Sequence, residues 1–173
     1  VSNGSCVAVD TIRVSIGTLL HPRISASDPP SRCEGDTLML RADAGYLSYE
    51  WRGAGGQLLA ITPDFAVTRS GAYVVSVRDA SGCAGSSDTL SAEFHPLPAP
   101  FILGPDAICD GDTALLDAGA AYAICDWRSA IGATVGNSRF LRVAAAGVYH
   151  VVVTDANGCT GTSPDHLIRQ FPN

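Results

Sequence analysis

An internal repeat constrains the fold of this chain more than any other feature of its sequence. When the sequence is shifted by 76 residues, residues 33–85 align with a second stretch without a gap. About two in five of the aligned positions are identical, which unrelated segments would not share. The chain therefore contains two copies of one module. The matching positions carry the same motifs, at residues 33–37 and 109–113, Trp51 and Trp127, residues 71–77 and 147–153, and residues 79–83 and 155–159.

The periodicity of each copy predicts β-strands. Apolar and polar residues alternate over residues 49–52 and 72–78, and a short apolar run over residues 37–42 is opened by a Gly-Asp turn. Residues 155–158 read Asp-Ala-Asn-Gly, which is typical of a hairpin turn. No segment combines a sustained helical period with capping residues. We therefore expect an all-β chain with essentially no helix.

The repeat also predicts the domain organisation. Two full modules should occupy residues 21–97 and 98–173. Residues 1–20 resemble the last strand of a module, so we expect the terminal strand of a preceding module, or a strand donated to another molecule. The linkers at residues 21–22 and 96–100 are short and stiffened by proline, which predicts a semi-rigid rod. We expect the chain to be a piece of a longer protein.

The spacing of the core candidates resembles that of an immunoglobulin sandwich. That fold places a cysteine in strand B, a tryptophan in strand C and a Tyr-x-Cys motif in strand F. Here Leu40 and Val75 stand at the cysteine positions, so apolar packing against Trp51 should join the two sheets. Tyr73 should form a tyrosine corner. The predicted fold is thus two tandem immunoglobulin-like β-sandwich modules, with a core made by Leu40, Trp51, Tyr73, Val75, Leu116, Trp127, Tyr149 and Val151.

Charge and composition exclude several classes of partner. The net charge is −6, whereas nucleic acids and anionic lipids both require a cationic face. The sequence has no lysine, so neither Schiff-base chemistry nor Lys–Asn isopeptide crosslinks are available. No run of 18 or more apolar residues is present, so no direct membrane insertion is expected.

No pattern of catalytic or metal-ligating residues stands out, so we expect no enzyme activity, metal or cofactor. The histidines lack metal-ligand spacing and are expected to be solvated surface residues, at His21, His95, His150 and His166. Asp165 precedes His166 without the nucleophile of a triad. Four acidic residues could offer oxygen ligands to Ca²⁺, although turn chemistry explains them better, at Asp110, Asp112, Asp117 and Asp126.

Six cysteines favour an oxidising, extracellular compartment. Cys33 should lie at one end of its module and Cys83 at the other, roughly 20 Å apart, whereas bridged Cα atoms lie within about 7 Å. This favours a disulfide between modules, Cys33 to Cys159, over pairing within each module, with Cys83 and Cys109 bonding to neighbouring units. Cys6 and Cys125 are expected either to be free thiols or to bond with each other or another chain.

The set of motifs resembles the immunoglobulin-like and PKD-like repeats of large cell-surface proteins in Bacteroidetes-type bacteria, over nearly the whole chain. The resemblance implies type IX secretion and a role as an adhesin, stalk or filament. Asp-Thr-apolar triplets also resemble the O-glycosylation signal of such exported proteins; alternatively, Asp-Thr merely opens a strand after a turn. The candidate acceptors are Thr11, Thr37, Thr89 and Thr113.

The function expected from these features is a structural or adhesive repeat segment, a disulfide-stapled semi-rigid rod. Its partners would be neighbouring modules or identical subunits joined head to tail. In a filament variant, residues 6–16 would add to the exposed sheet edge of another chain. The alternatives are a glycan- or protein-binding module that uses the loops at residues 43–48 and 79–82, or accessory domains of a large secreted hydrolase. These loops are short and poor in aromatic residues, which ranks binding lower.

Overall fold

The computed structural model describes residues 11–12 and 19–173, and every regular element in that part of the chain is a β-strand. This confirms the predicted all-β fold. The described part contains no helix that is long and apolar enough to cross a membrane. The strands enclose two separate cores. We call the unit formed by β1–β9 module 1 and the unit formed by β10–β17 module 2.

Module 1 is a sandwich of two sheets. The smaller sheet has the order β1-β3-β6, and the larger has the order β2-β9-β7-β4-β5, with β8 also pairing with β7. This corresponds to the A-B-E and G-F-C-C′ sheets of an immunoglobulin-like domain. The strands of module 1 are β1 (Ile24–Ala26), β2 (Ser31–Cys33), β3 (Leu38–Ala42), β4 (Ser48–Gly53), β5 (Leu58–Ala60), β6 (Asp64–Val67), β7 (Gly71–Arg78), β8 (Ala84–Ser86) and β9 (Leu90–His95).

Module 2 repeats the larger sheet, in the order β10-β17-β15-β12-β13 with β16 beside β15, but its smaller sheet has only two described strands, β11 and β14. A single bridge between Leu103 and Asp117 replaces the third strand. Pro105 follows closely and has no N–H with which to extend the pairing. The strands of module 2 are β10 (Ala107–Cys109), β11 (Ala114–Asp117), β12 (Ile124–Ser129), β13 (Thr134–Gly136), β14 (Phe140–Val143), β15 (Gly147–Thr154), β16 (Thr160–Thr162) and β17 (His166–Phe171).

Each core is centred on one fully buried tryptophan. Trp51 and Trp127 are both 0% exposed. The indole Nε1 of Trp51 donates a hydrogen bond to the carbonyl of Thr62 (2.9 Å), and that of Trp127 donates to the equivalent carbonyl of Ser138 (2.7 Å). The two tryptophans therefore have equivalent surroundings. The other six residues named as core candidates are also buried: Leu40, Tyr73, Val75, Leu116, Tyr149 and Val151.

A tyrosine fixes the turn that leads into the central strand of each larger sheet. The hydroxyl of Tyr73 donates to the carbonyl of Arg69 (2.8 Å), and that of Tyr149 donates to the carbonyl of Ala145 (3.1 Å). A hydroxyl that bonds to the backbone a few residues upstream is the geometry of a tyrosine corner. Each corner ties the connection between the two sheets to the strand that follows it.

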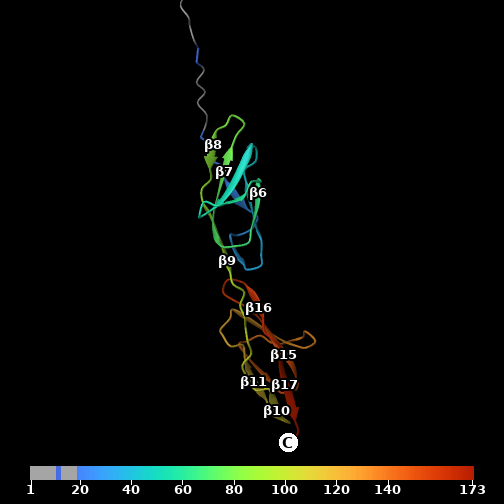
Figure 1. The fold of residues 1–173 in the computed structure, drawn as a ribbon. Helices are drawn as coiled ribbons and strands as arrows, with labels where there is room; N and C mark the ends of the chain where they lie inside the picture. Colours follow the sequence, from blue (N-terminus) through green and yellow to red (C-terminus); the bar gives the residue numbers. More distant parts are fainter. Residues whose placement is uncertain (1–10, 13–18) are drawn as a thin grey trace, which may run out of the picture.

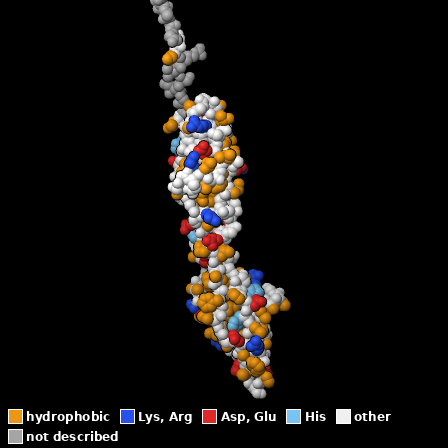
Figure 2. Space-filling model, in the orientation of Figure 1, with side chains coloured by type: hydrophobic (Ala, Val, Ile, Leu, Met, Phe, Trp, Pro, Cys, Tyr) orange, Lys and Arg blue, Asp and Glu red, His pale blue; other side chains and the backbone are white. Residues whose placement is uncertain are grey.

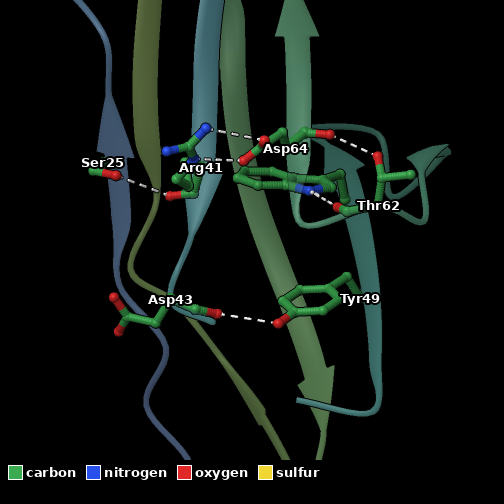
Figure 3. A network of polar contacts seen from close by, with 7 residues as sticks. Ser25, Arg41, Asp43, Tyr49, Thr62 and Asp64 are labelled. Atoms are coloured by element: carbon green, nitrogen blue, oxygen red, sulfur yellow. Dashed lines mark hydrogen bonds and ion pairs between the residues drawn. The ribbon is translucent and has the colours of Figure 1, made fainter. Parts of the chain in front are cut away.

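Polar contacts close the edge of the core in module 1 (Figure 3). The guanidinium of Arg41 in β3 donates two hydrogen bonds to Asp64 in β6, at 2.7 and 3.1 Å. The hydroxyl of Thr62 donates to the carbonyl of Asp64 (2.6 Å), and the carbonyl of Thr62 is the acceptor for Trp51. On the other side of the module the hydroxyl of Tyr49 donates to the carbonyl of Asp43 (3.2 Å). The polar atoms of these two buried aromatic side chains are thus hydrogen-bonded to the backbone.

The two modules are stacked end to end along one axis (Figure 1), and the molecule is narrower where they meet (Figure 2). In each module the backbone segment that enters the module lies in close contact with a glycine. Leu20 forms a β-bridge with Gly85, and an added Cβ on Gly85 would overlap the Leu20 carbonyl. In module 2 an added Cβ on Gly161 would overlap the Pro98 carbonyl in the same way. Only glycine lets the linker lie this close to the sheet.

Candidate functional site

The junction between the modules contains a disulfide bond. Cys33 of module 1 is joined to Cys159 of module 2, with their Cα atoms 5.6 Å apart and 126 residues between them in sequence. This is the pair that the sequence favoured on geometric grounds. Cys33 is half-buried and Cys159 is fully buried, so the bond lies within the contact between modules.

An aspartate-stabilised turn presents Cys159. A carboxylate oxygen of Asp155 accepts hydrogen bonds from the backbone N–H groups of Asn157 and Cys159, both at 2.9 Å. Gly158 completes the turn with a φ of 83°, which only glycine adopts without strain. The turn therefore holds the cysteine in a fixed position after β15 before any contact with module 1.

The end of module 1 that receives this turn is equally well defined. The last residue of β2, Cys33, lies opposite the last residue of β9, His95, in a parallel pair. The N–H of Glu34 donates to the carbonyl of His95 (2.8 Å), and the N–H of Asp36 donates to the carbonyl of Cys33 (3.1 Å). The linker leaves module 1 directly after His95. The disulfide therefore begins beside the point where the linker begins.

Linker and disulfide connect the same two places. The linker contains Pro96, Pro98 and Pro100, and it reaches module 2 at Gly161 in β16, close in sequence to Cys159. Module 1 is thus joined to module 2 by two covalent paths that run side by side. A single flexible linker would allow the modules to twist and bend, whereas a second attachment point removes most of that freedom.

The remaining described cysteines are free, and they differ in exposure. Cys83 is half-buried, Cys109 is exposed and Cys125 is buried. Burial raises the pKa of the Cys125 thiol, which disfavours the reactive thiolate there. Cys125 occupies the core position that Tyr49 fills in module 1. Cys6 lies outside the described residues.

The expectation that all four histidines are solvated was wrong for three of them. His21 is exposed, but the side chains of His95, His150 and His166 are only 17%, 22% and 15% exposed. Each lies on a strand of the larger sheet and beside a carboxylate. The carboxylate oxygens beside them belong to Glu93, Asp165 and Asp106, at 3.8, 3.5 and 3.8 Å respectively.

The acidic residues considered for Ca²⁺ are engaged separately. Asp117 is paired with Arg139, and Asp126 with Arg128. Both arginines hold the pKa of their carboxylates below the ordinary range. Asp110 accepts a hydrogen bond from Gln170, and the N–H of Asp112 closes a turn at Cys109. Within the described residues no three His, Cys, Asp or Glu side chains are grouped to hold a metal ion.

The Asp-Thr triplets lie at the surface. All four candidate acceptors are exposed. Thr37, Thr89 and Thr113 each directly precede a strand, which is also what the alternative interpretation of Asp-Thr as a strand opening predicts. The hydroxyl of Thr113 accepts a hydrogen bond from Arg142 (3.3 Å). Glycosylation of Thr11, Thr37, Thr89 and Thr113 stays a prediction.

Comparison with known proteins gives structural likeness only. The sequence matches no protein-family model and no curated protein. Among solved structures, the crystal structure of murine CEACAM1b is similar with a TM-score of 0.42 and 12% identity, covering 87% of this chain and all of that one. The human OSCAR ligand-binding domain is similar with a TM-score of 0.41 and 15% identity, covering 88% of this chain and all of that one.

Proposed function

We propose that this chain is a non-enzymatic structural segment of an extracellular protein, a rod whose modules are held in a fixed relative orientation by disulfide staples. The observation that carries the proposal is the Cys33–Cys159 bond beside the linker. A bond of this kind persists in an oxidising compartment, which supports a location outside the cytoplasm. The motif set described above supports the surface of a Bacteroidetes-type bacterium as its setting.

The position of one loop favours a structural rod over a ligand-binding module. The turn at residues 155–158 is the end loop that a binding module would present to a ligand, and in module 2 it faces module 1 at the junction. Its counterpart at residues 79–82 consists of small residues and contains no aromatic side chain. Loops that carry binding in this fold are usually longer and richer in aromatic side chains.

The proposal includes the assignment of residues 1–20 to the end of a preceding module. Leu20 meets Gly85 as Pro98 meets Gly161, and Pro98 follows β9, the last strand of module 1. The stretch before Leu20 therefore occupies the place in the chain that β9 occupies before Pro98. Most of this stretch lies outside the described residues, and so does the donor strand considered at residues 6–16.

The experiment measures how the modules are aligned relative to each other in solution. Residual dipolar couplings of the oxidised chain should fit one alignment tensor for both modules. In the Cys33→Ser, Cys159→Ser double variant the two modules should require different tensors, because only the linker then joins them. The Trp51 and Trp127 indole signals should keep their chemical shifts, which shows that both cores remain folded. Cys125→Ser is the matched control and should keep the single tensor. A single alignment tensor in the double variant would refute the proposal that the disulfide fixes the relative orientation of the modules.

A further inference from the structure

We propose that the two ends of this two-module segment are complementary, so that a disulfide joins Cys109 of one copy of the segment to Cys83 of the next. The inference deepens the proposed function and rests on it, because it extends the same junction beyond the two modules. Its basis is that each end of the molecule repeats one half of the bonded junction. Cys83 is the repeat counterpart of Cys159, and Cys109 is the counterpart of Cys33.

The turn at Cys83 is built like the turn at Cys159. A carboxylate oxygen of Asp79 accepts from the N–H groups of Ser81 and Cys83, both at 2.9 Å, and Gly82 has a φ of 87°. Burial alone would raise the pKa of Asp79, but hydrogen bonds from Ser81, Cys83 and Gly82 lower it. The carboxylate that shapes the turn is therefore charged at neutral pH. The turn that carries Cys83 is therefore preorganised in the same way as the turn that carries Cys159 at the existing junction.

The opposite end of the molecule repeats the receiving surface. β10 pairs in parallel with β17, as β2 pairs with β9, so Cys109 lies opposite Phe171 as Cys33 lies opposite His95. The N–H of Asp110 donates to the carbonyl of Phe171 (2.9 Å), and the N–H of Asp112 donates to the carbonyl of Cys109 (3.0 Å). These hydrogen bonds join the same positions as those around Cys33 and have similar lengths.

This receiving surface is open. Cys109 is exposed, and Phe171 beside it is 53% exposed. Both line a depression of about 260 Å³ together with Ile108 and Pro105. At the existing junction the equivalent Cys33 is half-buried and bonded. The surface around Cys109 therefore combines a free thiol and exposed apolar groups with the hydrogen-bonded turn that Cys33 has at the existing junction.

The positions of the two thiols exclude a bond between them within one copy of the segment. β8, which follows Cys83, lies at one end of the rod, and β10, which ends at Cys109, lies at the other (Figure 1). Bridged cysteines need Cα atoms within about 7 Å, so one copy cannot bond its own Cys83 to its own Cys109. The two surfaces are different and complementary, and an interface of that type adds copies in a line.

The bond forms by thiol–disulfide exchange with a small disulfide such as oxidised glutathione. The Cys109 thiolate attacks one glutathione sulfur, forms a mixed disulfide and releases one reduced glutathione. The Cys83 thiolate of the next copy then attacks the Cys109 sulfur of the mixed disulfide. This forms the Cys109–Cys83 bond and releases a second reduced glutathione. Two protein thiols are oxidised, and one glutathione disulfide is reduced.

The test uses the Cys6→Ser, Cys125→Ser background, in which Cys83 and Cys109 are the remaining free thiols. In a glutathione buffer at high protein concentration this chain should form a ladder on a non-reducing gel, with a Cys83–Cys109 peptide by mass spectrometry. Adding Cys83→Ser or Cys109→Ser alone should abolish the ladder. A mixture of these two variants should form dimers only, each with one copy of both.

Three results would overturn the inference: a chain that stays monomeric, a Cys109–Cys109 dimer that persists in the Cys83→Ser variant, or a ladder that survives either single substitution. None of them depends on the alignment of the two modules within one copy. The dipolar couplings described above can therefore support the rod while the gel rejects end-to-end joining, or the reverse.

Discussion

Arg41 and Asp64 form a two-pronged ion pair across β3 and β6, and module 2 contains a pair of reversed charge close to the same place. There Asp117 stands at the position of Arg41, and Arg139 donates to it at 2.8 and 2.9 Å. Arg139 directly precedes Phe140, which is the counterpart of Asp64 and lies opposite Asp117. Both modules thus have an ion pair between these two segments, although its charges and its register differ.

The reversal predicts a rescue experiment. Arg41→Asp alone should lower the midpoint of chemical unfolding of module 1, because it places two carboxylates opposite each other. Asp64→Arg alone should lower it similarly. The double substitution should restore most of the loss, because it places opposite charges at the same two paired positions. The effects should be small because the pair is exposed. A double variant no more stable than either single variant would contradict the assigned pairing.

The same pairs predict how stability depends on pH. Hydrogen bonding to Arg41 lowers the pKa of Asp64, and hydrogen bonding to Arg139 lowers that of Asp117. A carboxylate whose pKa is lower in the folded state contributes stability above its unfolded pKa of about 4 and loses it as pH falls through the folded pKa.

Urea unfolding should therefore show a midpoint that is steady near neutral pH and falls below about pH 4. Asp117→Asn should flatten this fall in module 2 and lower the midpoint at pH 7. Glu34→Gln is the control, because its exposed side chain has no hydrogen bond or ion pair within the described part of the chain. An Asp117→Asn profile parallel to that of the parent would refute the linkage.

The equivalent cores predict equivalent costs of truncation. Leu40 and Leu116 are both 0% exposed. Leu40→Ala should destabilise module 1 and Leu116→Ala module 2, each by about 2–5 kcal/mol. Each module has one tryptophan, so the fluorescence of a Trp51→Phe or Trp127→Phe background reports one module at a time. The cores would not be independent if Leu116→Ala destabilised module 1 as much as module 2 in the Cys33→Ser, Cys159→Ser variant, which lacks the disulfide.

The close contact between Gly161 and the Pro98 carbonyl predicts an effect on the reduction of the disulfide. Gly161→Val places a side chain where the carbonyl of Pro98 lies, so the linker must move away from β16. The modules should then separate more easily, and dithiothreitol should reduce the Cys33–Cys159 bond severalfold faster than in the parent. Thr160→Val, at an exposed neighbouring position, should leave the rate unchanged. Equal rates of reduction for Gly161→Val and the parent would contradict a role for this contact.

Much of the fold could be predicted from the sequence because its signals are local or repeated. Alternation in β4 and β7 marks Trp51, Tyr73 and Val75 as inward-facing, and the structure buries all three. The Cys33–Cys159 pairing could be inferred because cysteine positions at the ends of strands limit which sulfur atoms can meet. Both arguments need only the order of elements and the lengths of strands.

What the sequence could not reveal depends on neighbours across strands. His95, His150 and His166 are part-buried because residues of neighbouring strands and connections flank them, which no local pattern indicates. The Arg41–Asp64 pair requires the register of β3 with β6. The missing third strand in module 2 follows from a local break near Pro105 that the alignment of the two copies does not disclose.

The parallel course of linker and disulfide keeps the two modules joined when either connection is broken. A protease that cut the chain between Pro96 and Pro98 would leave two fragments, yet the Cys33–Cys159 bond would still hold them in one particle. Reduction without cleavage would be survivable in the same way. Severing the molecule would require both a protease and a reductant, and an oxidising environment rich in hydrolases supplies only the first.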